Sequence, residues 1–86
     1  MADNDILSFE MILTALREEA ADCFTDPVLV TIDFSKIADV DPKGGEAKVQ
    51  RLKSSRRVAF LKAELYQEDA LIFSAKAVFK ARAGLE

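Results

Sequence analysis

The amino-acid sequence predicts an α+β domain in which one N-terminal helix packs on a four-stranded antiparallel meander. Residues 8–24 repeat their apolar side chains every three or four positions, which is the period of a helix. From residue 28 onward apolar and polar side chains alternate, which is the period of a strand. Only short turn sequences interrupt this alternation, so we expect consecutive strands to lie side by side and antiparallel.

The size and composition of the chain limit what kind of protein it can be. Its 86 residues suffice for one domain, over residues 1–86. The hydrophobic fraction of 50% excludes a disordered tail. Cys23 is the only cysteine and histidine is absent, which excludes a disulfide, a Ser-His-Asp site and a histidine-bound metal. No apolar run reaches about 18 residues and no basic leader opens the chain, so we expect a cytoplasmic protein without membrane contact.

The helix is expected over residues 8–24. Its apolar residues form one stripe: Phe9, Ile12, Leu13, Leu16, Ala20, Cys23 and Phe24. Ser8 is the expected N-cap, or Asp5 if the helix begins earlier. Pro27 marks the end of the helix, because the residue before a proline avoids the helical conformation.

The first two strands are expected over residues 28–35 and 46–53. In the first, the alternation places Val28, Val30, Ile32 and Phe34 on one face. In the second, the alternation breaks near Arg51, which predicts a β-bulge. Pro42 and the glycines up to Gly45 predict a turn between the two strands.

The third and fourth strands are expected over residues 57–66 and 71–81, with a turn at residues 67–69. One face of this pair is apolar: Ala59, Leu61, Ala63, Leu65, Leu71, Phe73, Ala75, Ala77, Phe79 and Ala81. The repeated alanines leave room for a helix to lie close to the sheet. Phe60 and Tyr66 lie on the opposite face, which a single helix cannot also cover. We therefore expect a homodimer or a higher homo-oligomer that buries this second face.

Charge is distributed unevenly along the chain. Residues 1–26 contain seven acids against Arg17 alone, a balance of −6. Residues 27–86 contain eleven basic residues against eight acids, a balance of +3. This pattern argues against nucleic-acid binding, which needs a dense basic face, and is compatible with one local anion site in the second part.

Two known architectures have a helix followed by four antiparallel strands, the hotdog fold and the cystatin-like fold. The stretches GEAKVQRL (45–52), RRVAFLKAEL (56–65) and AKAVF (75–79) resemble the last three strands of hotdog-fold acyl-CoA thioesterases of the phenylacetate-pathway type. The Gln-x-Val-x-Gly motif of cystatins has no counterpart, which favours the hotdog-like alternative. The resemblance implies that two copies join their sheets into one.

The resemblance also implies a function, namely binding and hydrolysis of an acyl-CoA thioester. Coenzyme A would enter as part of the substrate, and no separate cofactor is expected. Aligning the helix expected at residues 8–24 with the helix of the family places Glu18 at the position of the family's catalytic acid. The family's His-Gly-Gly element falls on residues 9–11 and is absent, and its structure ahead of the helix is missing. The alternative function is therefore a shortened, non-catalytic hotdog module that acts as a homo-oligomeric binding or structural protein.

Glu18 is the candidate general base or nucleophile for thioester hydrolysis. The helical period places it opposite the apolar stripe, where a carboxylate is usually only solvated.

A basic cluster surrounds the hairpin between the second and third strands: Lys48, Arg51, Lys53, Arg56 and Arg57. Arg56, Arg57 and Lys53 are the candidates for binding the phosphates of coenzyme A. The same charges are also typical of an edge hairpin that resists aggregation. Cys23 lies on the apolar stripe without a histidine to activate it, so we assign it to the core.

Overall fold

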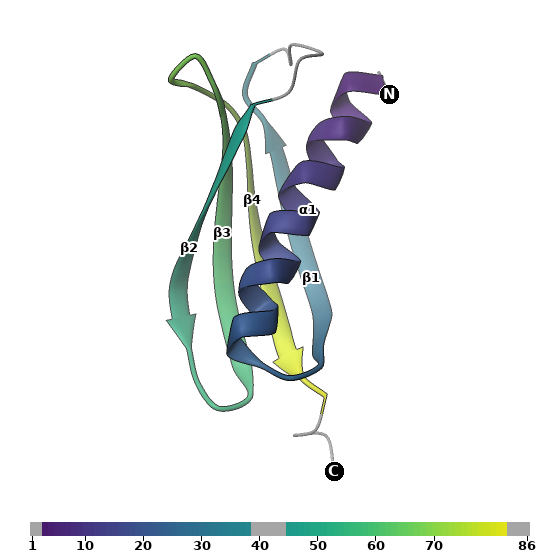
Figure 1. Ribbon diagram of the computed structural model, residues 1–86, viewed down its shortest axis with the longest axis vertical. Coiled ribbons are helices and arrows are strands. Elements are labelled where there is room, and N and C mark those ends of the chain that lie inside the picture. Colours follow the sequence, from purple (N-terminus) through teal and green to yellow (C-terminus); the bar gives the residue numbers. More distant parts are fainter. Residues whose placement is uncertain (1–2, 39–44, 83–86) are drawn as a thin grey trace.

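The computed structural model describes residues 3–38 and 45–82. Its elements are the helix α1 (Asp3–Cys23) and the strands β1 (Pro27–Lys36), β2 (Glu46–Ser54), β3 (Val58–Gln67) and β4 (Ala70–Ala81) (Figure 1). The strands form one antiparallel sheet with α1 on one face, so the predicted α+β class is confirmed. In the described part of the chain, no helix is both long and apolar enough to cross a membrane.

The strand order is β1-β4-β3-β2, which differs from the expected meander. Strands β2, β3 and β4 are consecutive neighbours, but β1 pairs with β4 instead of β2. In a meander β4 would be an edge strand. Its side chains Phe73 and Phe79 are instead almost completely buried, which suits a central strand. Pairing with β1 places β4 inside the sheet and satisfies its backbone groups on both sides.

A cluster of three phenylalanines connects α1 to β1 and β4. The ring of Phe9 lies 4.5 Å from that of Phe34 and 5.3 Å from that of Phe73, between ring centroids. Phe34 and Phe73 are 6.3 Å apart in an edge-to-face arrangement. These contacts hold β1 beside β4 and explain why the meander prediction fails.

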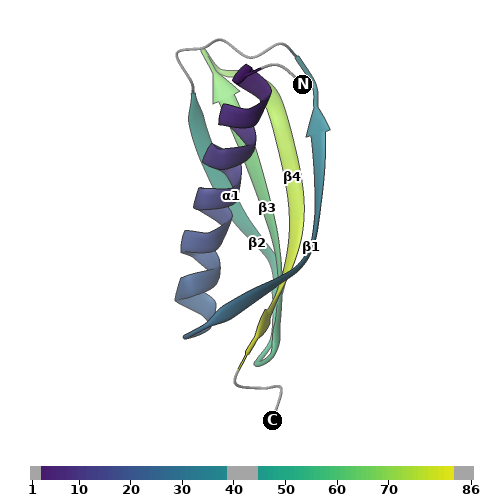
Figure 2. The same cartoon turned by 90° about the vertical axis from the view of Figure 1, so that its right-hand side faces the viewer.

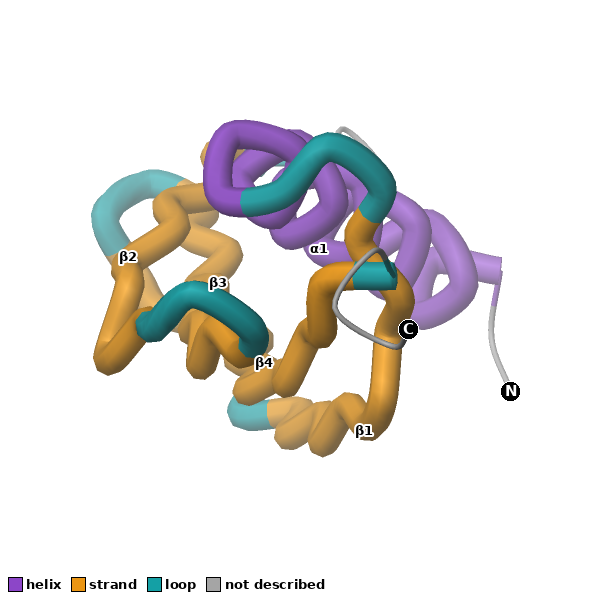
Figure 3. Tube along the Cα trace, turned by 90° about the horizontal axis from the view of Figure 1, so that it is seen from below, coloured by secondary structure: helices purple, strands orange, loops and turns teal. Residues whose placement is uncertain are grey.

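The core lies between α1 and the concave face of the sheet, which curves around the helix (Figures 2 and 3). Five helix and post-helix residues spaced four apart are buried: Ser8, Ile12, Leu16, Ala20 and Phe24. Below them lie the buried side chains of the central strands: Ala59, Leu61, Ala63, Leu65, Phe73, Ala75, Ala77 and Phe79. The predicted apolar stripe and the predicted inner face of β3 are confirmed.

The helix begins at Asp3, five residues before the expected start. Ser8 is therefore not the N-cap but a fully buried residue inside the helix. Position 8 continues the four-residue spacing of the buried row, which favours the longer helix.

Three irregularities change which side chains face the core. A register shift between Leu29 and Thr31 turns Leu29 toward the core and leaves Val30 51% exposed. Val28 lies opposite Lys80 on the outer side of the sheet, so the predicted face of β1 is wrong at Val28 and Val30. The bulge predicted near Arg51 is confirmed, between Arg51 and Lys53. A third shift, after Leu65, makes Ile72 a buried residue in place of Leu71.

The turns have different requirements. A Cβ atom at Gly45 would lie 2.3 Å from the carbonyl oxygen of Tyr66, so only glycine fits where β2 begins beside β3. In the β3–β4 turn both Glu68 and Asp69 have positive φ, 51° and 68°. Positive φ at both central residues is typical of a type I′ hairpin turn. The rest of the turn predicted around Pro42 falls outside the described residues.

Candidate functional site

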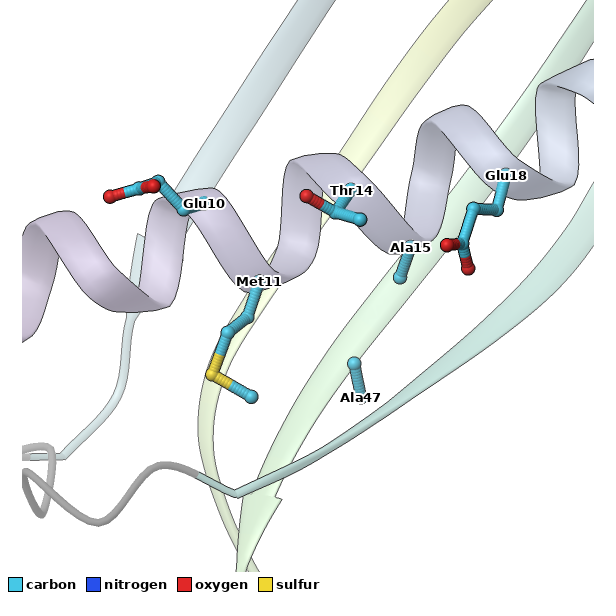
Figure 4. Close-up of a pocket in the computed structure, with 6 residues that line it drawn as sticks. All are labelled: Glu10, Met11, Thr14, Ala15, Glu18 and Ala47. Atoms are coloured by element: carbon cyan, nitrogen blue, oxygen red, sulfur yellow. The ribbon is translucent and has the colours of Figure 1, made fainter.

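The clearest hollow beside Glu18 lies between α1 and the edge strand β2 (Figure 4). We call it the α1–β2 groove. Its volume is about 430 Å³, and it is lined by Glu10, Met11, Thr14, Ala15, Glu18 and Ala47. The groove thus contains Glu18, the residue that the resemblance nominates.

The groove follows from the period of the helix and from the position of β2. Residues three, four or seven apart share one side of a helix, so positions 11, 14, 15 and 18 all face the same direction. Met11 and Ala15 point toward Ala47 in Figure 4, and Glu18 bends toward the same side. Because Ala15 and Ala47 are small and β2 has no neighbour on its outer side, a hollow remains between the two elements.

The groove has one carboxylate suited to general-base chemistry and few partners for it. Glu18 is exposed. Glu10, the other acid, is eight residues earlier, about 12 Å along the helix axis, too far to act with it as a pair. Among the six lining residues only Thr14 carries a neutral hydrogen-bond donor on its side chain. The arrangement can hold a water next to Glu18 but offers little to stabilise an oxyanion.

The neighbouring acid, Glu19, is already engaged. Its carboxylate accepts a hydrogen bond from the guanidinium of Arg51 on β2. This hydrogen bond is the largest of several influences that raise the pKa of Arg51 above its ordinary value. Arg51 therefore anchors β2 to α1 and is not a free cation of the hairpin. The sequence signal for this contact is the alternation of β2, which places Arg51 on the same inner face as Ala47 and Val49, opposite Leu61. The alternation does not identify Glu19 as the partner.

The predicted phosphate-binding residues lie at the β2–β3 turn. Lys53, Arg56 and Arg57 are all exposed. Among the described residues their side chains have no ion-pair partner. Ser55 shapes the turn, because its hydroxyl accepts hydrogen bonds from the backbone N–H groups of Val58 at 3.2 Å and Arg57 at 3.4 Å.

The basic turn lies beyond the Glu18 end of the groove. Glu19, the neighbour of Glu18, pairs with Arg51, which is three residues before the end of β2 at Ser54. Ala47, at the other end of β2, is seven residues before Ser54, about 23 Å in an extended strand. One protomer thus presents a groove along α1 and β2 and, past one end of it, a group of cations without an ion-pair partner among the described residues.

Neither Cys23 nor a cluster of metal-binding side chains contributes to the α1–β2 groove in the described part of the chain. Cys23 is a free, half-buried thiol packed against the edge of the core, less buried than expected. Across residues 3–38 and 45–82, no group of three acidic or cysteine side chains is placed to hold a metal ion.

The outer face of the sheet has its own polar cluster, which sequence reasoning missed. Tyr66 donates a hydrogen bond to Glu64 at 3.1 Å, and Lys62 lies 3.6 Å from the same carboxylate. The ammonium of Lys48 lies 5.0 Å from the centre of the Tyr66 ring. The hydrogen bond to Glu64, followed by desolvation, raises the pKa of Tyr66 above 10.0.

The comparisons with known proteins place the chain by its fold alone. No model of a known protein family matches it, and no curated protein does. Among solved structures it is similar to conserved protein PA5202 from Pseudomonas aeruginosa, with a TM-score of 0.54 and 24% sequence identity. The match covers 64% of this chain and 44% of PA5202, so the chain spans less than half of that protein's length. The likeness concerns the arrangement of helix and sheet and carries no information about activity.

Proposed function

We propose that the chain is a hotdog-like domain that binds an acyl-CoA thioester as a homodimer. The observation that carries the proposal is the α1–β2 groove, with Met11, Ala15 and Ala47 along its sides and the Glu18 carboxylate within it. Small and apolar walls suit an acyl or pantetheine chain, and a carboxylate beside a thioester can activate water. The sequence resemblance to hotdog thioesterases supports the same substrate class.

The cations of the β2–β3 turn are proposed to bind the phosphates of coenzyme A. Arg56 and Arg57 lie in a short, defined turn and have no ion-pair partner among the described residues. Guanidinium groups bind phosphate oxygens in bidentate fashion, which favours arginine at such a site.

A dimer through β2 would bring the two halves of this site together. β2 is an edge strand, so its outer backbone groups are available for a second copy. When two identical strands pair antiparallel, the end of one lies beside the start of the other. The basic turn of one protomer would then approach the Ala47 end of its partner's groove, the end that lies about 23 Å along β2 from the turn of its own protomer.

The alternative, a binding module without catalysis, also has a specific observation in its favour. The lining of the groove offers no side-chain donor for an oxyanion besides Thr14, and the His-Gly-Gly element is absent. One removed oxyanion donor typically lowers kcat by about 10²–10³. Binding is therefore the primary activity we propose, with Glu18 as the residue that would carry hydrolysis.

Calorimetry with coenzyme A and with acyl-CoA esters of several chain lengths tests binding. Replacing Arg56 and Arg57 together by Ala should weaken binding by about 1–3 kcal/mol for each lost charged contact. The loss should shrink at high salt, because the turn is exposed. Arg17→Ala, a cation on the exposed side of α1, is the matched control. Equal affinity in the double variant and the parent, or no binding by either, contradicts the proposal.

A hydrolysis assay over the same esters separates the two functions. If Glu18 is the general base, Glu18→Gln should lower the rate by about 10²-fold or more and leave binding intact. Glu10→Gln removes the other carboxylate of the groove and should have little effect. Binding without hydrolysis in the parent protein would establish the non-catalytic module.

Cysteine cross-linking in a Cys23→Ser background tests the dimer. Residues of paired antiparallel strands approach within about 4.5–5.5 Å between Cβ atoms, so one of Lys48→Cys, Gln50→Cys or Leu52→Cys should form a disulfide-linked dimer. Phe60→Cys, on the face of the sheet, should not. Light scattering that reports a 9.5 kDa monomer at micromolar concentration would exclude the dimer.

A further inference from the structure

The outer face of the sheet, opposite α1, contains a second hollow. Its volume is about 260 Å³, and its lining includes Thr31, Asp33, Leu52, Phe60, Lys76 and Val78. Phe60 is 41% exposed and Leu52 is 47% exposed, so two large apolar side chains meet solvent at its rim. The hollow is smaller than the roughly 300–1,000 Å³ of most small-molecule sites, and its size suits one inserted side chain.

Four lysines surround the apolar pair Phe60 and Val78 on this face. In the strand register Lys53 lies opposite Phe60. Two residues further along the strands Lys62 lies opposite Lys76, and on the other side Lys80 lies opposite Val58. Asp33, the register partner of Lys76 in β1, is the acid in the lining. The apolar hollow thus lies inside a basic rim.

This arrangement is not explained by the stability or the solubility of the fold. Like charges directly opposite each other on neighbouring strands destabilise a sheet, and Lys62 and Lys76 are such a pair. Glu64, 3.6 Å from Lys62, and Asp33, opposite Lys76 in β1, offset part of this repulsion. Lysines often protect an edge strand from aggregation, but β3 and β4 are the two central strands. An exposed apolar centre with a basic rim is, however, the arrangement expected of a binding surface for a negatively charged partner.

The same charges indicate which partner fits. A second copy packed face to face would bring many of these lysines near each other, which favours an acidic partner here over the homo-oligomer contact expected from Phe60. Nucleic acid would need several stacking rings, and Phe60 is the one aromatic residue in the lining of the hollow. A peptide with carboxylates on both sides of one large apolar residue satisfies both the rim and the hollow.

We propose that the outer face of the sheet is a docking surface for an acidic segment of another protein. One large apolar side chain of that segment inserts between Phe60 and Leu52, and flanking Asp or Glu residues contact Lys76, Lys62 and Lys80. The apolar anchor supplies most of the specificity, and the lysines accelerate association. This surface faces away from α1 and is separate from the α1–β2 groove, so the inference does not depend on the proposed function.

A random 12-residue peptide library displayed on phage, with the parent protein as bait, tests the inference. We expect enrichment of peptides with one Phe, Leu, Ile or Trp flanked by Asp or Glu. Fluorescence anisotropy with a synthetic copy of an enriched peptide should then show binding that weakens as salt increases.

Charge-matched variants locate the binding surface. Lys76→Glu should weaken binding of the enriched peptide about tenfold or more, and Phe60→Ser should abolish it. Lys48→Glu makes the same charge change on the same face, about 16 Å further along the sheet from Lys53, and should change affinity less than about twofold. Thermal melts serve as the folding control. Lys76→Glu should melt close to the parent, because it removes the repulsion with Lys62 but places a carboxylate opposite Asp33.

Three outcomes would overturn the proposal. The first is a library that enriches no acidic sequence. The second is equal binding of an enriched peptide by the parent and by Lys76→Glu. The third is binding of oligo(dT) or phosphatidylserine vesicles to the same face in preference to the peptide. The last result would assign this face to a different class of partner.

Discussion

The inner and outer faces of β3 and β4 are built from alternate residues of the same two strands, yet their environments are opposite. On the inner face, Leu61, Ala63, Ala75 and Phe79 are almost completely buried beneath α1. On the outer face, the neighbouring residue Phe60 is 41% exposed and is surrounded by lysines. The inner face determines the fold because it has a partner within the chain. The outer face keeps apolar and charged groups that have no comparable partner among the described residues, so it is the place to look for contacts with other molecules.

The largest expected difference in the free energy of unfolding comes from truncating one large side chain on each face to Ala. Leu61→Ala should lower the free energy of unfolding by about 2–5 kcal/mol, because it leaves a cavity under the helix. Phe60→Ala, one residue earlier, should cost clearly less, about 1 kcal/mol, because its ring is 41% exposed and its removal leaves no enclosed cavity. Chemical denaturation of both variants gives the comparison. Equal losses would mean that the outer face is also covered in solution.

A smaller effect is expected from enlarging a side chain on each face. Ala63 is fully buried below α1, so Ala63→Leu should push the helix away and cost about 1–3 kcal/mol. Lys62→Leu adds an apolar side chain to the outer face without crowding the core. It removes the repulsion with Lys76 and also the partly exposed ion pair with Glu64, two small effects of opposite sign. Its thermal midpoint should therefore stay close to that of the parent. A drop as large as that of Ala63→Leu would refute this account of the two faces.

The inner face was largely predictable from the sequence, and its exceptions have local causes. The period of two identified Ala59, Leu61, Ala63 and Leu65 because each strand must turn one row of side chains to the helix. Val28 and Val30 were assigned to the wrong face because one extra residue in a strand reverses the alternation, and nothing in the sequence of β1 marks that residue. The position of β1 beside β4 depends on the Phe9, Phe34 and Phe73 cluster, a contact between distant segments that local patterns do not reveal.

The candidate site was predictable only in part. Glu18 and the exposed cations Lys53, Arg56 and Arg57 were identified because residue type and helical or turn position sufficed. The pair between Arg51 and Glu19 was missed, because it depends on how α1 crosses β2. The basic rim around Phe60 was missed for the same reason, since it forms only when β2, β3 and β4 are in register.

The smallest expected effect concerns the polar end of the outer face and is measured as a pKa. Tyr66 is the only tyrosine and the chain has no tryptophan, so phenolate absorbance reports this one side chain directly. The hydrogen bond to Glu64, then desolvation, then the charge of Glu64 favour the neutral phenol, so the pKa of Tyr66 should lie above 10.0 in the folded protein. Glu64→Ala removes two of these causes and should move the midpoint of the alkaline titration back toward 10.0. Asp33→Ala, which removes a different acid of the same face, should leave that midpoint in place.

Because the folded state holds the phenol proton more tightly than the unfolded state, the contribution of the raised Tyr66 pKa to stability is complete below pH 10. It decreases as pH rises through the folded pKa, and Glu64→Ala should flatten that decrease. A midpoint at 10.0 in the parent protein would show that the Tyr66–Glu64 hydrogen bond does not persist in solution.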